Sequence, residues 1–520
     1  MGAAASSGVR LAELVATISL GTDLGLGQSM EHILRQTLVS LRMAELLAFD
    51  EAEREVAYFS GLLAWVGCHT DAYEQAKWFG DDIALKRDGY HYDMGRPVDL
   101  LTFAWHTVGR GRPPLERLKT WLELPLAVRR SAMVDLRNHW LAADELAGRL
   151  GLGEPVRRSL RESFERWDGK GFGGSRGEEI RLTSRVVCLA DVVTAYYEEG
   201  GENAAVQVAW QRSGTQFDPA LVELFCGNAA DVLSGLDGPS QWAQVIDAEP
   251  TLARPMTDPE FDVALEAIAD FIDLKSPYTL GHSRSVADLA GAAARVLGLP
   301  DEDCVAVRRA GLVHDLGRLG VPNSIWDKHG PLTRSEMERV RLHPYLSERM
   351  LSSAHALGPL AAIAVEHHER MDGSGYPRGL NHASISVVGR VLGAADCYAA
   401  ATEPRPHRAQ LTPEEAAAAL RTQVRAGRLD ADAVQAVLEA AGHRTRRRRE
   451  LPAGLTAREV EVLRLLTRGL SNRDIAEKLT ISRKTAGSHI EHIYTKIGAS
   501  NRATASLFAM QYGLLHDPTG

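Results

Sequence analysis

The side chains best suited to chemistry are histidines and aspartates that lie between residues 282 and 396. They are His282, the neighbours His314 and Asp315, His343, the neighbours His367 and His368, and Asp396. Imidazole and carboxylate groups together suit first-row divalent metals such as Fe, Mn or Zn. A lone histidine would more often be structural. A carboxylate beside a histidine, however, can bridge two metals. Such a metal pair can activate water and clamp a phosphoryl group. The full set therefore predicts a binuclear site that acts on a phosphate ester.

Part of this set belongs to a stretch that occurs twice. Residues 367–379 read HHERMDGSGYPRG, and residues 163–174 read SFERWDGKGFGG, which keeps the loop and lacks the histidine pair. Other short matches keep nearly constant offsets, pairing His32 with His282, His139 with His343, and Asp191 with Asp396. We therefore predict two versions of one helical domain, with extra residues between Trp65 and His139 in the first.

The first copy lacks most of the predicted ligands. Ala64 and Trp65 stand where the second copy has His314 and Asp315, and Ser163 and Phe164 replace the histidine pair. Without the bridging carboxylate this copy cannot build a binuclear site, and its rings are expected to fill the cavity by packing. Two roles stay open: an internal partner that packs against the active copy, or a sensory pocket. Further possible ligands, more often surface or core residues, are His69, Asp71, His91 and Asp93.

The segments HDLG, RLHP and HHERMDGSGYPRGL, together with the late Asp396, resemble the HD-GYP subgroup of HD-domain phosphohydrolases over about residues 256–435. Members of that family are all-α, metal-dependent phosphodiesterases that hydrolyse cyclic di-GMP. The resemblance implies two divalent transition metals, Fe or Mn before others, because Tyr278 stands where three-metal members carry Glu. The first metal would be held by His282, His314, Asp315 and Asp396, and Asp315 would bridge to a second held by His343, His367 and His368.

The same resemblance implies residues that meet the substrate. The glycine-rich loop lets the backbone approach it closely, Tyr376 would pack on a guanine, and Arg370 or Arg378 would meet phosphate. The expected substrate contacts are Arg370, Asp372, Gly375, Tyr376 and Arg378. Asp315 and Arg318 are the expected catalytic pair. The family usually has Lys at position 318, and the planar guanidinium of Arg predicts altered turnover with metal binding intact.

The C-terminal residues 455–515 carry helix-capping signals at Thr456 with Glu459, at Ser471 and at Ser482. The resulting helix, short turn and helix resemble the LuxR-type DNA-binding domain over about 60 residues. The resemblance makes 484–497 the recognition helix in the major groove. A homodimer is expected, either through this domain, where a fourth helix from Asn501 would pair subunits, or through the HD domains. Gly487, Ser488 and Glu491 would face bases. The other expected DNA contacts are Lys484, Thr485, His489, Lys496 and Arg502.

Bulk properties agree with several helical domains. Apolar residues at three-to-four spacing predict a mostly helical chain. Together with the two resemblances, this implies an all-α chain with tandem HD-type domains at 1–245 and 256–435, a basic linker at 436–453 and a four-helix LuxR-type domain at 454–520. Residues 444–520 carry a net charge of +7 and the remainder −16, so the tail is expected to meet DNA. Scattered cysteines, no convincing signal peptide and no apolar run of membrane length predict a cytoplasmic protein with no membrane partner.

These observations favour a transcription regulator that hydrolyses a cyclic dinucleotide and binds DNA. Two alternatives stay open. The chain could sense the nucleotide with slow or no turnover, because Arg318 departs from the family pattern and because the site is joined to a DNA-binding domain. It could also hydrolyse another phosphate ester, since HD-type chemistry is broad.

Overall fold

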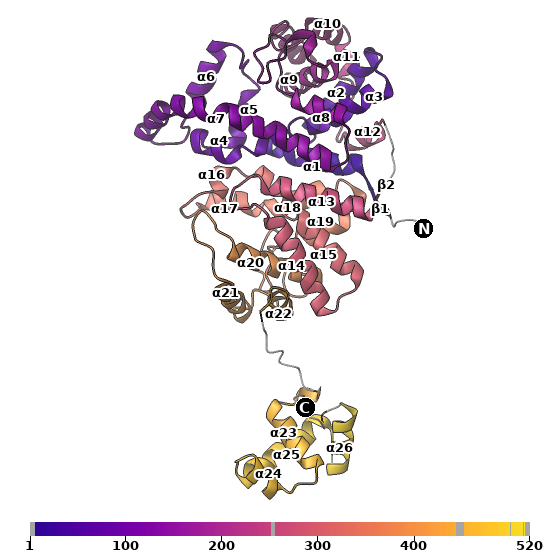
Figure 1. Ribbon diagram of the computed structural model, residues 1–520, viewed down its shortest axis with the longest axis vertical. Helices are drawn as coiled ribbons and strands as arrows, with labels where there is room; N and C mark the ends of the chain where they lie inside the picture. The colour runs from indigo at the N-terminus through magenta and orange to yellow at the C-terminus, as the bar shows by residue number, and fades with distance from the viewer. Residues whose placement is uncertain (1–5, 251–254, 444–451, 500, 513, 515–520) are drawn as a thin grey trace. The chain divides into compact units, whose positions relative to one another are not determined.

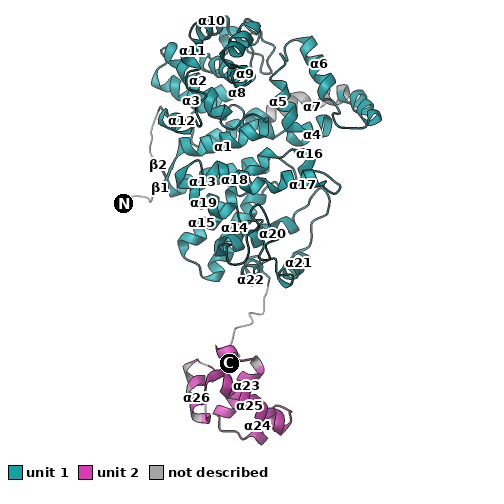
Figure 2. Ribbon diagram, turned by 180° about the vertical axis from the view of Figure 1, so that it is seen from behind, with its two compact units in different colours: residues 1–443 teal, residues 444–520 magenta. Residues whose placement is uncertain are grey.

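A computed structural model describes residues 6–250, 255–443, 452–499, 501–512 and 514. It comprises two compact units, residues 1–443 and 444–520, which Figure 2 colours separately. Helices form nearly all of the regular structure in both units, so the predicted all-α class is confirmed. Among the described residues, no helix is long and apolar enough to cross a membrane.

The first half of the larger unit holds twelve helices within the described residues (Figure 1). They are α1 (Leu11–Leu26), α2 (His32–Leu46), α3 (Glu51–Leu63), α4 (Ala72–Phe79), α5 (Asp82–Gly89), α6 (Pro97–Thr107), α7 (Pro114–Arg149), α8 (Glu154–Arg161), α9 (Leu182–Gln211), α10 (Pro219–Gly227), α11 (Ala229–Val232) and α12 (Trp242–Asp247). The 3-10 helix η1 (Val66–His69) follows α3, and η2 (Gly177–Glu179) precedes α9.

The second half holds ten described α-helices. They are α13 (Asp258–Asp273), α14 (His282–Leu297), α15 (Asp301–Val313), α16 (Asn323–Trp326), α17 (Arg334–Arg341), α18 (His343–Leu351), α19 (Gly358–Ala364), α20 (Val387–Thr402), α21 (Pro413–Arg425) and α22 (Ala431–Ala440). The 3-10 helix η3 (Leu316–Gly320) follows α15, and η4 (His355–Leu357) precedes α19. Helix α22 continues beyond residue 435, so the boundary expected there falls inside a helix.

The two halves share one hydrophobic core. Strand β1 (Ser6–Arg10) pairs antiparallel with β2 (Pro255–Thr257), a contact between segments almost 250 residues apart that no strand pattern in the sequence indicated. Helix α1 packs against η3: a Cβ built on Gly21 would lie only 3.0 Å from Cδ1 of Leu319. The core cluster of the larger unit accordingly includes residues of both halves, from Val9 to Leu438.

The smaller unit has its own core. It contains η5 (Pro452–Gly454), α23 (Ala457–Thr467), α24 (Asn472–Lys478), α25 (Arg483–Ile497) and α26 (Arg502–Gln511). The side chains of Thr456, Ser471 and Ser482 each accept a backbone N–H in the first turn of the helix that follows, as their positions before apolar runs predicted. Leu463, Ile475 and Ile493, from three different helices, pack in the centre.

Candidate active site

Helix ends place the predicted metal ligands. His282 and His343 are the first residues of α14 and α18, and His314 and Asp315 join α15 to η3. Helix α14 can begin at His282 because Gly281 adopts a left-handed φ of 80°. The close approach of η3 to α18 also requires glycine, since a Cβ on Gly317 would lie 2.0 Å from the His343 carbonyl oxygen. His367 and His368 follow α19, and Asp396 lies in the middle of α20.

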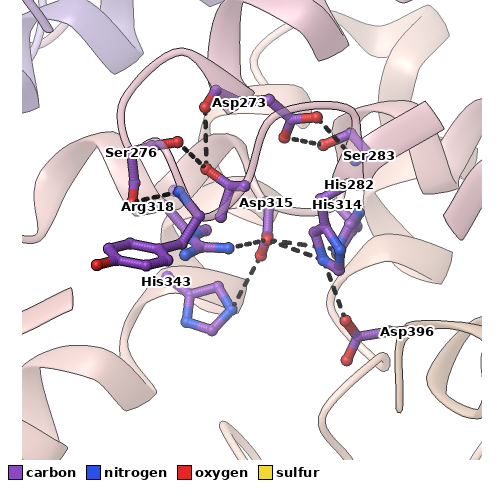
Figure 3. Close-up of polar contacts among 12 residues, drawn as sticks. Asp273, Ser276, His282, Ser283, His314, Asp315, Arg318, His343 and Asp396 are labelled. Carbon is purple, nitrogen blue, oxygen red and sulfur yellow. Dashed lines mark hydrogen bonds and ion pairs between the residues drawn. The ribbon is translucent and has the colours of Figure 1, made fainter. Parts of the chain in front are cut away.

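The five histidines of the set surround the carboxylates of Asp315 and Asp396. Six of these residues form two groups, and within each group the ligand atoms lie within 4.8 Å of one another. One group is His282, His314 and Asp315, and the other is His343, His367 and His368. Asp315 faces both groups: its Oδ2 lies 3.5 Å from Nε2 of His314, and its Oδ1 lies 3.3 Å from Nε2 of His343 (Figure 3). Asp396 also lies between them, with Oδ1 3.3 Å from Nε2 of His282 and Oδ2 3.8 Å from Nδ1 of His368.

The hydrogen bonds of three imidazoles leave a nitrogen lone pair toward the centre. Nδ1 of His314, His343 and His367 each lies 2.6–2.8 Å from the carbonyl oxygen of the residue three positions earlier, so each Nδ1 donates. Each Nε2 is then an acceptor. Nε2 of His314 is buried without a hydrogen-bond partner among the described residues, and those of His343 and His367 face each other at 3.1 Å. Buried acceptors in this arrangement fit a cation.

The pKa shifts in the site favour the charged forms of two carboxylates and the neutral forms of three histidines, namely Asp315, Asp396, His314, His367 and His368. Burial opposes ionisation of Asp315, but His314, Arg318 and His343 outweigh it and hold the pKa of this carboxyl well below its usual range. Burial, with His314 and His343 nearby, lowers the pKa of His367 to about 3. His282 differs: burial lowers its pKa, but the carboxylates of Asp396 and Glu403, 3.3 Å and 2.9 Å from its ring nitrogens, raise it to about 9. Deprotonated carboxylates and neutral imidazoles are the forms that bind metals.

A cavity of about 270 Å³ opens onto these groups. Five of the predicted metal ligands line it, namely His282, Asp315, His343, His368 and Asp396. Its other lining residues are Ser276, Tyr278, Arg318, Trp326, Asp327, Tyr376, Ala400, Arg405, Pro406, His407 and Arg408. A pocket of this size, with metal-ligand groups at its base and arginines at its wall, suits part of an anionic substrate.

Comparisons with known proteins agree with this geometry. The HD domain model matches residues 266–433, and the model of bacterial regulatory proteins of the luxR family matches residues 453–509. The 3'3'-cGAMP-specific phosphodiesterase 3 of Vibrio cholerae is 32% identical over 414 residues, which cover 78% of this chain and 90% of that relative. The chain belongs to the HD-GYP family of phosphodiesterases. Enzymes of this family depend on metals, and the predicted HD-GYP and LuxR-type resemblances are both confirmed.

Two further comparisons add to the HD-GYP relationship. A cyclic di-GMP phosphodiesterase of Pseudomonas aeruginosa is 40% identical over 145 residues, 27% of this chain and 35% of the relative. The crystal structure of a cyclic GMP-AMP-specific phosphodiesterase of Vibrio cholerae matches with a TM-score of 0.57 and 26% identity, and covers 85% of this chain and 99% of that one. The likeness therefore extends through the first half as well as the HD domain.

The structure places only one expected substrate contact of this HD-GYP protein, Tyr376, in the pocket lining, with its ring 4.7 Å from that of His368. Arg370 instead donates to the carbonyls of His367 and Glu369. The Asp372 carboxylate accepts from Ser374 within the loop, and Arg378 pairs with Glu348. A Cβ on Gly375 would lie 2.3 Å from the Arg370 backbone nitrogen, so this glycine is required for the fold of the loop.

Several lining residues were missed by the sequence analysis. Trp326 is the last residue of α16, and Arg405 and Arg408 lie between α20 and α21. Arg405 donates to the Tyr278 carbonyl and pairs with Glu403. The available signal was the cluster of two arginines and a histidine that directly follows the helix of Asp396.

The first half has a counterpart site without the metal groups. Nε2 of His32 lies 3.3 Å from Oδ1 of Asp191, the separation found between His282 and Asp396. The Trp65 and Phe164 rings meet edge to face at 5.3 Å, and the Tyr90 hydroxyl donates to Asp191 at 2.9 Å.

The additional ligand candidates of the first half do not gather within the described residues. His69 bonds the Phe271 carbonyl, Asp93 pairs with Arg166, and His91 lies beside Glu199. Asp71 belongs to neither of the metal-ligand groups found.

The expected DNA contacts lie on α25 and at the start of α26. Lys484, Thr485, Ser488 and Glu491 are exposed, and Gly487 and His489 are half-buried. Two of the expected DNA contacts bond within the unit: Lys496 pairs with Glu459 at 2.7 Å, and Arg502 donates to the Leu470 carbonyl.

Proposed function

We propose that the second half hydrolyses a cyclic dinucleotide and that residues 452–514 bind DNA, so that the chain is a transcription regulator with a phosphodiesterase site. The observation that carries the enzymatic part is the position of Asp315, whose two carboxylate oxygens face two separate groups of buried imidazoles. The HD-GYP relationship supports the reaction class, and the luxR-family match supports DNA binding.

The seven-residue set fits two divalent metals, and Fe or Mn suits its mixture of imidazoles and carboxylates. One would be held by His282, His314, Asp315 and Asp396, and the other by His343, His367 and His368 with Asp315 between them. Such metals supply Lewis acidity, which lowers the pKa of water and neutralises phosphate charge. The carbonyls that accept from each Nδ1 keep the rings turned toward this centre.

The chain's own residues bind and orient the substrate. Arg318, whose Nη1 lies 2.8 Å from Oδ2 of Asp315, presents a guanidinium to the pocket beside the metal groups and stabilises negative charge on a phosphate. Tyr376 offers a ring face for a base. Arg405 and Arg408 add further positive charge to the pocket lining, which suits a dianionic cyclic dinucleotide.

The names of the relatives suggest two candidate substrates for this chain. The relative that matches over 414 residues, through both halves, is named as specific for 3'3'-cGAMP, and a relative that matches over 145 residues is named for cyclic di-GMP. Because this chain shares both halves with the former, 3'3'-cGAMP is the first substrate to test.

We infer that the first half is a non-catalytic copy that packs against the active one. Support comes from equivalent details: Gly67 approaches the His139 carbonyl as Gly317 approaches that of His343. The loop of SFERWDGKGFGG is also kept, since the Asp168 carboxylate accepts from Lys170 N as that of Asp372 does from Ser374 N. Trp65, Phe164 and Tyr90 fill the place of ligands.

We also propose that α25 enters the major groove, with Lys484 near phosphates and Ser488 and Glu491 near bases. These side chains are exposed on one helix of a unit that has its own core. Pairing of two chains through α26 would present two such helices to a two-fold operator.

The test is incubation of the Mn- or Fe-loaded full chain with 3'3'-cGAMP and, separately, with cyclic di-GMP, followed by chromatography. The proposal expects a linear dinucleotide from at least one. Asp288→Asn is a matched control, because Asp288 shares α14 with His282 but its side chain is 69% exposed. Binding without a linear product would leave a nucleotide sensor, and neither binding nor product would reject a cyclic dinucleotide as ligand.

A further inference from the structure

One wall of the catalytic pocket is held by contacts from the other half of the chain. Ser276 and Tyr278, after α13, and Trp326 and Asp327, at the end of α16, line this wall. Each segment meets the first half: the Tyr278 ring lies edge to face with that of Tyr73 at 6.3 Å. The His69 ring, with Nε2 2.7 Å from the Phe271 carbonyl oxygen, supports the end of α13.

A further group of contacts from the first half is made by the carboxylate of Asp82, the first residue of α5. It is fully buried and accepts the backbone N–H of Asn323 at 2.8 Å. Its other oxygen lies 3.3 Å from the Lys86 ammonium and 3.6 Å from that of Lys275. The Lys275 ammonium is also buried and has no hydrogen-bond partner among the described residues. Asp82 is thus the counter-charge that allows Lys275 to lie beneath the wall.

From Asp82 a sequence of hydrogen bonds leads to the pocket. The Asn323 side-chain amide donates to the Lys275 carbonyl at 2.6 Å and to Oδ2 of Asp327 at 2.8 Å. Oδ1 of Asp327 accepts from the Ser276 hydroxyl at 2.6 Å. A carboxylate of the first half therefore ties together the two segments of the second half that line this wall.

We propose that Asp82 is a positioning residue: it fixes the wall of the catalytic pocket from the non-catalytic half, so that the first half sets the affinity of the active site for its dinucleotide. This inference rests on the proposed function of the pocket. Asp82 touches none of the seven metal-ligand side chains in the described contacts, so its effect acts on substrate binding and leaves the metal centre intact.

Asp82→Asn separates positioning from folding because the amide oxygen still accepts from Asn323 while the charge that holds Lys275 is removed. We expect KM for the hydrolysed dinucleotide to rise by between about fivefold and a hundredfold, since small displacements of a binding wall have effects of this size. Two properties should stay within about twofold of wild type. One is the metal content of the chain, and the other is the rate of hydrolysis of bis(p-nitrophenyl) phosphate, a substrate too small to extend along this wall.

Asp88→Asn is the matched control: it changes another aspartate of α5, one that pairs with Arg110 away from the pocket, and should leave KM unchanged. If Asp82→Asn fails to fold, Asp82→Ala with Lys275→Met removes the unpaired ammonium together with the acceptor of the Asn323 N–H, and should show a rise in KM of the same size. Equal KM values for wild type, Asp88→Asn and the Asp82 variants would overturn the inference. Absence of turnover in wild type would instead count against the proposed function.

Discussion

The guanidinium of Arg318 lies 4.1 Å from the centre of the Trp326 ring, and its Nη1 lies 2.8 Å from Oδ2 of Asp315. The indole itself stands edge to face with His343. A lysine at position 318 could carry the charge but could not both stack on the indole and present a planar fork to the carboxylate. Trp326 thus explains how arginine is accommodated where the family usually has lysine.

The first prediction concerns this stacked pair. Trp326→Leu should lower kcat/KM by about 2- to 30-fold, the range expected for loss of one cation–π contact. Arg318→Lys, which keeps the charge, should lose less activity than Arg318→Ala. Steady-state kinetics with measured metal content decide this, and a Trp326→Leu enzyme with wild-type kcat/KM would show that the indole does not hold Arg318.

Metal stoichiometry provides the second prediction. His343→Ala removes a ligand of only one of the two groups, so elemental analysis of the purified chain should fall from about two metals to about one. His355→Ala is the control because His355 is an exposed histidine outside both groups. Retention of both metals by His343→Ala would remove this residue from the ligand set.

The third prediction is a pH dependence of stability that arises in the first half. Burial lowers the pKa of His139 to about 4, whereas an unfolded histidine titrates near 6.5. Between these values the unfolded chain binds the additional proton, so the free energy of unfolding should fall as pH falls from about 6.5 to about 4, by at most about 1.4 kcal/mol per pH unit from this residue.

Urea unfolding across that range, with chelator present, measures this effect. His139→Gln keeps a donor for the Ala64 carbonyl, which Nε2 of His139 meets at 3.3 Å, but cannot be protonated. Its unfolding free energy should depend less steeply on pH than that of wild type. Identical slopes would show that His139 does not contribute to acid sensitivity.

The fourth prediction distinguishes two lysines of α25. Lys484 is exposed, whereas the Lys496 ammonium pairs with Glu459 and bonds the Gly454 carbonyl. Lys484→Ala should weaken DNA binding across sequences and reduce the slope of log K against log salt by about 1. Lys496→Ala should mainly lower the melting temperature of the smaller unit. Binding titrations and thermal melts measure the two effects. If Lys496→Ala weakened DNA binding while Lys484→Ala lowered the melting temperature, the assignment of these two lysines would be wrong.

Much of the site was predictable because metal chemistry restricts residue types. His282, His314, Asp315 and Asp396 are recognisable from their types and neighbours, and the capped helices of the smaller unit from local spacing. Trp326 and Asp82 were not predictable. A stacked indole and a buried carboxylate have no sequence pattern of their own, and the contact between Asp82 and Asn323 spans 241 residues. The ion pair of Lys496 with Glu459 was not predictable for a similar reason, because the two residues lie on different helices.

The central claim is that Asp315 organises a hydrolytic metal site in the second half. The most direct measurement is the rate of linear dinucleotide formation by metal-loaded wild type and by Asp315→Asn, with Asp288→Asn alongside. Our account predicts that wild type and Asp288→Asn turn over equally and that Asp315→Asn loses activity by about a thousandfold or more, as expected when a group central to the reaction is removed. Equal turnover by Asp315→Asn and wild type would contradict it.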